Sequence, residues 1–213
     1  MDTAATSESQ VEVVHRERSA TQILVLVILM AAVYGAGLYV TRGVVFIPGV
    51  TWFRPANALS ELYGVNFGLW GALAAGIGNT LNDILGGEFN LVLFAPIFIL
   101  EVVCTALIPY WIVTDPTLRS TRGKIEWLVG VVILQGLTTG FGIAAVLVAT
   151  GTVPSNLFFP IGQTISLNEG VPAIVAGVIQ YALFPQLYKM GLYMGRRLEG
   201  SNAPADYVAS LAS

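Results

Sequence analysis

The sequence has only one cysteine and one histidine among its 213 residues, and both scarcities exclude classes of function. A single cysteine cannot form an internal disulfide, and the place of Cys104 in an apolar run predicts core packing. The histidine, His15, lies in a polar stretch near the N-terminus, so the sequence contains no Cys/His cluster of the kind that binds zinc. We expect neither a metal site nor a cofactor.

Charged residues are also scarce, at 11% of the chain, whereas soluble domains contain roughly 25%. Hydrophobic residues make up 55% of the sequence, and several apolar runs are long enough to cross a bilayer. A net charge of −3, with the basic residues confined to short segments, argues against binding to nucleic acid. No Gly-rich phosphate-binding motif with its lysine is present. The composition predicts an all-α, multi-pass protein of the lipid bilayer.

The apolar runs predict six transmembrane helices within a membrane domain of residues 21–197, with a disordered tail at 1–20 and a second polar tail at 198–213. No small-residue cleavage site follows the first run, so we interpret it as a membrane helix and not as a signal peptide. The second helix is short and rises about 16 Å, roughly half of the hydrocarbon core. The expected helices are 21–41, 55–64, 66–85, 89–113, 124–150 and 167–195.

The distribution of lysine and arginine predicts that both termini are cytoplasmic and that the protein lies in the cell membrane. With this orientation only Arg42 and Arg54 of the ten basic residues fall on the outer side. The basic residues assigned to the inner side are Arg16, Arg18, Arg119, Arg122, Lys124, Lys189, Arg196 and Arg197.

Polar side chains within the predicted spans gather towards the outer end, whereas the inner halves are almost wholly apolar. Charged residues at membrane depth normally face a bundle interior or a wet cavity. Arg54, Asn57 and Glu61 share one helix face, which either holds an internal Arg54–Glu61 contact or faces an outward-opening pocket. The candidate residues for binding a polar solute are Trp52, Arg54, Asn57, Glu61, Asn79, Asn82, Asp83, Thr138, Thr139, Gln163, Asn168 and Glu169.

Several of these signals have a structural alternative. Asn79, Asn82 and Asp83 share a helix face, so they fit hydrogen bonding between helices as well as ligand contact. Glu101 fits an intramembrane hydrogen-bond partner better than a proton carrier, because no second carboxylate is evident on its face. Trp111 and Trp127 flank the predicted inner loop and are interpreted as interfacial anchors, whereas Trp52 lies beside Arg54 in the outer connection and is a candidate for ligand contact.

The stretch RPANALSELYGVNFGLWGALAAGIGNTLNDILGG, residues 54–87, resembles a region of the substrate-binding S components of energy-coupling factor (ECF) transporters. In that family a polar helix start precedes a glycine-rich run of the form G-x-x-F-G-P-x-x-G-x-x-x-G-x-x-x-D-x-x-G. The proline of the pattern is replaced here by Leu69. The matching positions are Gly64, Phe67, Gly68, Gly71, Ala75, Gly78 or Asn79, Asp83 and Gly86. Helix order and size extend the resemblance over residues 20–197.

The resemblance implies an S-component-like bundle of six helices, with a short second helix and a long outer connection between helices 1 and 2. It implies capture of a vitamin or related small heteroaromatic micronutrient from outside, without enzymatic activity. Transport would require docking on a transmembrane coupling subunit that is driven by two ATPase subunits. The small-xxx-small pair Ala32 and Ala36 would form the docking face. Residues 42–53 would cover the binding site.

Two other functions remain open at this point. A stand-alone secondary transporter or channel-like carrier would use Glu61 or Glu101 together with Asp83 for ion coupling. It would need a continuous polar track to the inner face, which the sequence does not display. A membrane enzyme would require clustered aspartates or a His/Glu metal set, and neither is present.

Overall fold

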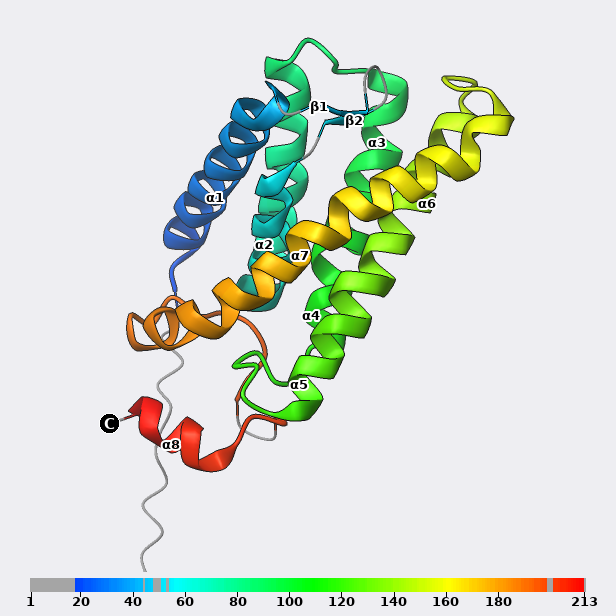
Figure 1. Cartoon of the computed structure of the whole chain (residues 1–213). Helices are drawn as coiled ribbons and strands as arrows, with labels where there is room; N and C mark the ends of the chain where they lie inside the picture. The colour runs from blue at the N-terminus through cyan, green and yellow to red at the C-terminus, as the bar shows by residue number, and fades with distance from the viewer. Residues whose placement is uncertain (1–17, 44, 48–50, 53, 199–200, 213) are drawn as a thin grey trace, which may run out of the picture.

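The computed structural model describes residues 18–43, 45–47, 51–52, 54–198 and 201–212. Residues 1–17, which make up most of the predicted N-terminal tail, lie outside the described part. The described chain is an all-helical bundle apart from one small two-stranded antiparallel sheet, formed by β1 (Val45–Ile47) and β2 (Thr51–Trp52) (Figure 1).

Four helices of the described part are long and apolar enough to cross a membrane, which supports the prediction of a membrane protein. The first is α1 (Ala20–Val40), and the second comprises α3 (Leu91–Leu100), η3 (Glu101–Leu107) and α4 (Ile108–Ile112). The third comprises α5 (Thr121–Glu126), η4 (Trp127–Gln135) and α6 (Gly136–Ala149). The fourth comprises η5 (Ser155–Leu157) and α7 (Phe158–Lys189).

The outward faces of these helices carry large apolar side chains, as expected of surfaces in contact with lipid. On α1, Leu24, Val25 and Ile28 are each at least 50% exposed, and Val178 of α7 is 68% exposed. A soluble protein rarely displays apolar patches of this extent. The exposed faces therefore indicate a bilayer as the surroundings of the bundle.

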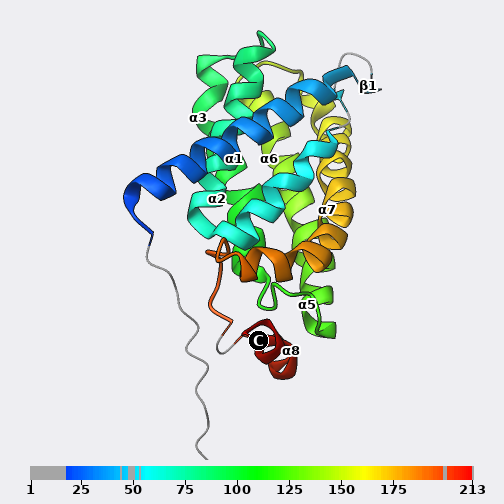
Figure 2. The ribbon, with the colours of Figure 1, turned by 90° about the vertical axis from the view of Figure 1, so that its left-hand side faces the viewer.

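Helix α2 (Ala58–Leu85) reverses direction at Gly68, which has φ +57° and ψ −132°, a conformation that only glycine adopts readily. The chain before Gly68 and the chain after it both pack against α1 (Figure 2). Tyr34 of α1 contacts Asn57, which directly precedes α2, and lies against Gly78, which follows the reversal. The sequence predicted the break between 64 and 66. That position is wrong, because Gly64 stays helical and its missing side chain lets the Ala106 carbonyl approach closely.

Two elements at the ends of the chain also differ from the prediction. Helix α7 begins at Phe158, about two and a half turns before the expected residue 167. Pro160 is compatible with this earlier start because it falls in the first turn, where its missing N–H would have no intrahelical partner. Helix α8 (Ala205–Ala212) occupies part of the segment that was expected only as a polar tail. Its Leu211 is buried against Phe184, Tyr193 and Leu198, so packing on the end of α7 holds this short helix in place.

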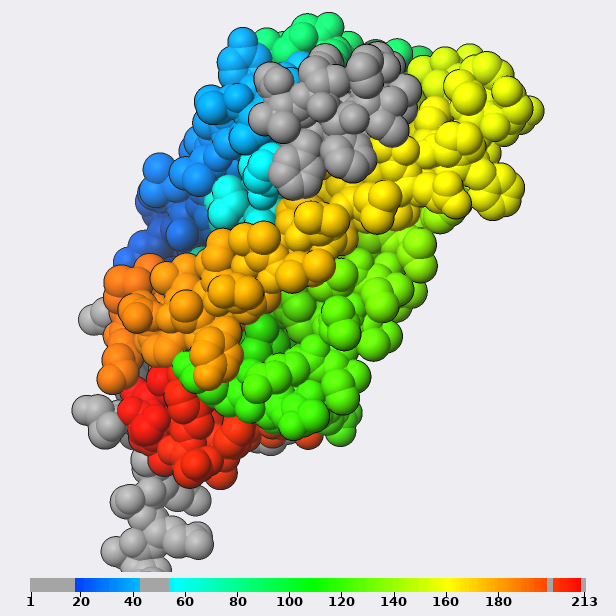
Figure 3. All heavy atoms as spheres, in the orientation of Figure 1, coloured from blue at the N-terminus to red at the C-terminus, as the bar shows by residue number. Residues whose placement is uncertain are grey.

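The described bundle has two different ends. Residues 18 and 19, the 113–120 loop and α8 lie at one end, which we call the terminal end (Figure 1). The strands, the 86–90 turn and the 150–157 turn lie at the other, which we call the opposite end. Helix α7 crosses one face of the molecule from the opposite end to the terminal end, where the C-terminal residues cover its last turns (Figure 3).

Candidate functional site

A cavity of about 210 Å³ lies towards the opposite end of the bundle, where α2, α3, η3, α6 and α7 converge. Its apolar wall comes mainly from isoleucines and a leucine of α3, α6 and α7, and its polar wall contains five charged residues. The lining residues are Arg54, Asn57, Asn79, Asp83, Glu88, Ile97, Glu101, Ile143, Leu147, Ile165, Asn168 and Glu169. Eight of the twelve lining residues are polar or charged, so this is a polar cavity with one apolar wall.

Arg54 is held at this cavity by contacts to two different helices. Its backbone N–H donates to Oδ1 of Asn168 on α7 at 2.9 Å. Its guanidinium group donates to Oδ1 of Asn79 on α2 at 3.5 Å, a long hydrogen bond. Among the described residues Arg54 has no carboxylate within ion-pair distance. The guanidinium group is therefore positioned at the cavity wall but keeps most of its hydrogen-bonding capacity.

A chain of buried hydrogen bonds runs along the polar wall. The Tyr34 hydroxyl donates to Oε1 of Glu101 at 2.8 Å. The Asn57 amide donates to Oε1 of Glu169 at 2.6 Å, and the Gln135 amide makes a longer contact to Oε2 of the same carboxyl at 3.4 Å. All five side chains are at least 94% buried. The prediction that Glu101 has an intramembrane partner is confirmed, but Tyr34 and Gln135 were not among the predicted site residues.

Glu61 is fully buried near this wall, and neither of its carboxyl oxygens has a hydrogen-bond partner among the described residues. The predicted internal Arg54–Glu61 contact is wrong, because the Arg54 guanidinium turns towards Asn79 and Glu61 lies about two turns deeper on its helix. Glu61 is instead within electrostatic range of Glu169 and Glu101. The expectation that Glu101 has no second carboxylate nearby is also wrong. Three carboxyl groups from α2, η3 and α7 therefore lie within electrostatic range of one another in the core.

Asn82 and Asp83 belong to a second polar group, at the rim of the cavity. Arg42 donates to the side chain and the backbone carbonyl of Asn82, both at 2.8 Å. The same guanidinium lies 3.1 Å from Glu88 and 3.8 Å from Asp83. Arg42 thus links the end of α1 to the end of α2, so Asn82 serves helix packing whereas Asp83 also lines the cavity.

The remaining predicted site residues lie in different surroundings. Thr139 is fully buried and lies 3.5 Å from the amide of Gln135, next to the polar wall. Thr138 donates to backbone carbonyls of its own helix and does not line the cavity. Gln163 is exposed on α7 and does not line it either. Trp52 is in strand β2, but its side chain lies outside the described part of the structure.

Below the cavity the bundle is closed by a tightly packed apolar layer, which includes Leu62, Val65, Val131, Ala173 and Ala176. Trp127 belongs to this layer and is 4% exposed, with its indole N–H donating to the Ala173 carbonyl at 2.9 Å. The prediction of an interfacial anchor is therefore wrong for Trp127, because the η4–α7 packing encloses it. Trp111, which is 52% exposed, remains at the surface. Cys104 is buried, as predicted.

The terminal half of the bundle is less purely apolar than the sequence suggested. Asn66 and Gln180 exchange two hydrogen bonds of 2.6 and 3.1 Å, and Gln180 also donates to the Pro116 carbonyl at 2.7 Å. The buried amides therefore join α2 to α7 and to the 113–120 loop.

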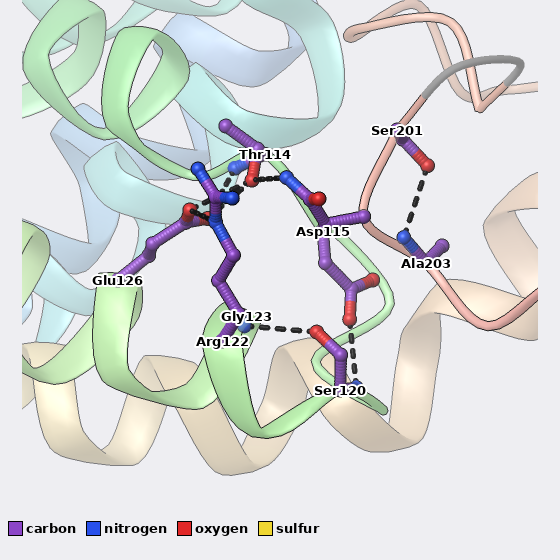
Figure 4. Close-up of polar contacts among 9 residues, drawn as sticks. Thr114, Asp115, Ser120, Arg122, Gly123, Glu126, Ser201 and Ala203 are labelled. Carbon is purple, nitrogen blue, oxygen red and sulfur yellow. Dashed lines mark hydrogen bonds and ion pairs between the residues drawn. The ribbon is translucent and has the colours of Figure 1, made fainter.

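The 113–120 loop and the C-terminal segment hold each other through a separate polar cluster (Figure 4). Asp115 is fully buried and accepts from the backbone N–H groups of Thr117 and Ser120. Thr114 donates to Glu126 and accepts from the Asn202 amide at 2.6 Å.

An aromatic group completes this end of the molecule. The Arg119 guanidinium lies 3.6 Å from the ring centroid of Tyr181 and 4.8 Å from that of Tyr207 on α8. Burial raises the pKa of Tyr193, which packs beside this group, well above its ordinary value. The Arg119 guanidinium therefore joins α7 to α8.

The small residues of α1 divide into two sets. Gly35 approaches Gly78 so closely that an added Cβ atom would lie 2.8 Å from the Gly78 carbonyl oxygen, so this pair makes the α1–α2 contact. Ala32 and Ala36 are exposed on a different face of α1. Internal packing therefore does not account for the Ala32–Ala36 pair.

Comparison of the chain with protein-family models, with curated proteins and with solved structures gave no match.

Proposed function

We propose that this protein is the solute-binding membrane subunit of an ECF-type importer, which captures a small heteroaromatic micronutrient and passes it on through a separate coupling subunit and two ATPase subunits. The observation that carries the proposal is the 210 Å³ cavity, which combines an apolar wall with a preorganised set of amide, guanidinium and carboxyl groups. Such a set orients a ring-sized polar solute through hydrogen bonds while the apolar wall contacts its faces.

The shape of the bundle supports binding by a subunit that depends on partners. The cavity lies at the opposite end, and the packed layer around Val131 and Ala176 separates it from the terminal end. In the cell membrane, with both termini cytoplasmic as the basic residues predict, the cavity faces outwards. Passage of a solute through this layer requires a rearrangement of the bundle, which docking on a coupling subunit would drive.

Ala32 and Ala36 supply a surface for this docking. Both are exposed and lie one turn apart on α1, where their small side chains allow another helix to approach closely. Reversal of α2 at Gly68 gives the short second helix of the proposed six-helix S-component fold. The β1–β2 segment, at the end that holds the cavity, is the outer connection that would cover the site.

A two-part experiment tests the proposal. The purified full-length chain in lipid nanodiscs should bind a member of a vitamin and nucleobase panel without ATP, as measured by isothermal titration and by thermal stabilisation. Arg54→Met should weaken this binding, and Gln163→Ala, which changes an exposed side chain outside the cavity, is the matched control. Absence of binding across the panel would count against solute capture.

The second part tests docking in cells that supply the coupling subunit and ATPases. Ala32→Trp or Ala36→Trp should abolish uptake but leave solute binding intact, because a bulky side chain on the exposed face blocks only the approach of a partner. Val178→Trp, which places the same bulky side chain on the exposed face of α7, serves as the control. Unchanged uptake in the alanine variants would remove the basis for this docking face.

A stand-alone, ion-coupled carrier is the second candidate function. The observation in its favour is that Glu61, Glu101 and Glu169 are buried within electrostatic range of one another, since intramembrane carboxyl groups are typical of ion-coupled transporters. Solute accumulation by proteoliposomes that contain only this chain, driven by a proton or sodium gradient, would favour the carrier over the importer subunit.

A further inference from the structure

The carboxyl groups of the cavity outnumber its basic groups, and this imbalance bears on the kind of solute that the cavity accepts. Four acidic residues line the cavity, and Arg54 is the only basic residue in the lining. Arg42, outside the lining, pairs with Asp83 and Glu88. Glu101 and Glu169 have no ion-pair partner among the described residues, and their side-chain hydrogen bonds come from uncharged tyrosine, asparagine and glutamine groups. Arg54 lies within electrostatic range of both carboxyl groups, so one guanidinium group serves two carboxyl groups.

Unpartnered acceptors beside these two residues provide a second, independent observation. Both carboxyl oxygens of Glu61 and the amide oxygen of Gln135 are buried without a hydrogen-bond donor. The Gln135 amide nitrogen lies next to Glu169, and Glu61 is within electrostatic range of both Glu101 and Glu169. Buried acceptors without donors are costly and rare in native proteins. The described core around Glu101 and Glu169 thus holds more hydrogen-bond acceptors than donors.

A metal ion does not fit this arrangement. Within the part of the chain that the structure describes, no group of three His, Cys, Asp or Glu residues converges closely enough to hold one. The cavity volume of about 210 Å³ also far exceeds the space that a single ion or water needs. The missing partner is therefore a larger molecule that carries its own N–H donors.

We propose that the cavity binds an organic cation, with the protonated nitrogen group of the solute placed between Glu101 and Glu169. Glu61, which lies behind the lining, adds negative charge near them. An amidinium or ammonium group supplies both positive charge and N–H donors to the two lining carboxyl groups. The inference rests on the proposed solute-binding function and narrows its substrate class from heteroaromatic solutes in general to those with a protonated nitrogen.

Matched compounds test the charge requirement separately from solute capture. Benzamidinium, benzamide and benzoate have nearly the same shape but carry positive, zero and negative charge, and benzylammonium with benzyl alcohol forms a second pair. Isothermal titration of the full-length chain in nanodiscs should give at least about tenfold tighter binding for each cation than for its uncharged counterpart, as expected for a charge-assisted hydrogen bond in a desolvated site.

Variants then assign the preference to the named carboxyl groups. Glu101→Gln and Glu169→Gln should each reduce the preference for the cation about tenfold, whereas Glu101→Asp, which keeps the charge, should retain most of it. Asp206→Asn removes an exposed carboxylate on α8, far from the cavity, and should leave the preference for the cation unchanged. Thermal unfolding of each variant verifies that it is folded.

The outcomes distinguish the requirement for a cation from solute binding itself. Equal or tighter binding of benzamide or benzoate would overturn the cation requirement and leave solute capture standing. A cation preference that survives both glutamine substitutions would overturn the assignment to Glu101 and Glu169. Failure of these five compounds and of the vitamin and nucleobase panel to bind would overturn both the cation site and the proposed function.

Discussion

The hydroxyl group of Tyr34 on α1 donates a 2.8 Å hydrogen bond to the carboxyl group of Glu101 in η3. Both side chains are buried, and the same hydroxyl lies 3.3 Å from Oδ1 of Asn57. One phenol thereby links three elements around the cavity. Because Glu101 lines the cavity, this contact joins the packing of α1 to the position of a proposed ligand-binding carboxyl group.

Tyr34→Phe removes this donor without changing the shape of the side chain. We expect a loss of about 1–3 kcal/mol in unfolding free energy, because the Glu101 carboxyl loses a buried hydrogen bond. The measurement is denaturant or thermal unfolding in detergent. Tyr39→Phe removes the same group from a side chain that is 47% exposed on the same helix and should change little. Equal effects in both variants would contradict the structural role of the Tyr34–Glu101 bond.

Glu61→Met replaces a buried, unpartnered carboxyl group by an apolar side chain of similar length. We expect the protein to become more stable by about 1–3 kcal/mol, since an unsatisfied polar group leaves the core. Binding of benzamidinium should become weaker at the same time. Such opposite changes are typical of residues that are kept for function. A large loss of stability would instead indicate that Glu61 has a structural partner.

Gly78→Val tests the close contact between α1 and α2. An added Cβ atom at this position would lie 2.8 Å from the Tyr34 ring and 2.9 Å from the Ala31 carbonyl oxygen. We expect destabilisation of about 1–3 kcal/mol or more from the forced separation of the helices. Ala36→Val, on the exposed face of α1, should be tolerated. The midpoint of thermal unfolding distinguishes the two variants. An unchanged midpoint for Gly78→Val would contradict the close contact between α1 and α2.

Asn66 and Gln180 should show strong energetic coupling in a double-mutant cycle. Each single change to leucine leaves the amide of the other residue without a buried partner and should cost about 1–3 kcal/mol. The double variant should cost clearly less than the sum, with a coupling energy of about 0.5–3 kcal/mol. Additive effects would mean that the two hydrogen bonds contribute nothing specific.

Arg119→Ala should release helix α8 from the terminal end of the bundle. The guanidinium group of Arg119 is the contact between Tyr181 of α7 and Tyr207 of α8, and cation–π contacts contribute roughly 0.5–2 kcal/mol each. Hydrogen exchange in 205–212 should therefore become several-fold to tenfold faster. Lys124→Ala removes a nearby positive charge without this contact and serves as the control. Unchanged exchange in the Arg119 variant would show that apolar packing alone holds α8.

Much of the architecture follows from local sequence patterns. The apolar runs predicted helices whose bounds agree with α1 and with the 91–112 and 121–149 spans to within a few residues. The polar stripe of Arg54 and Asn57 correctly indicated the cavity wall, as did Asn79, Asp83, Asn168 and Glu169. The start of α7 was missed because a proline in a first helical turn has the same local sequence signal as a proline in a loop.

The sequence by itself determined which segments are apolar enough to cross a membrane and which helix faces are polar, because hydrophobicity and side-chain periodicity are local properties. Only the tertiary structure decided which polar groups meet. Glu61, Glu101 and Glu169 lie far apart in the chain, and their approach depends on the reversal at Gly68 and on the packing of η3 and α7. Partner choice in the core is set by such long-range packing, which no local pattern encodes.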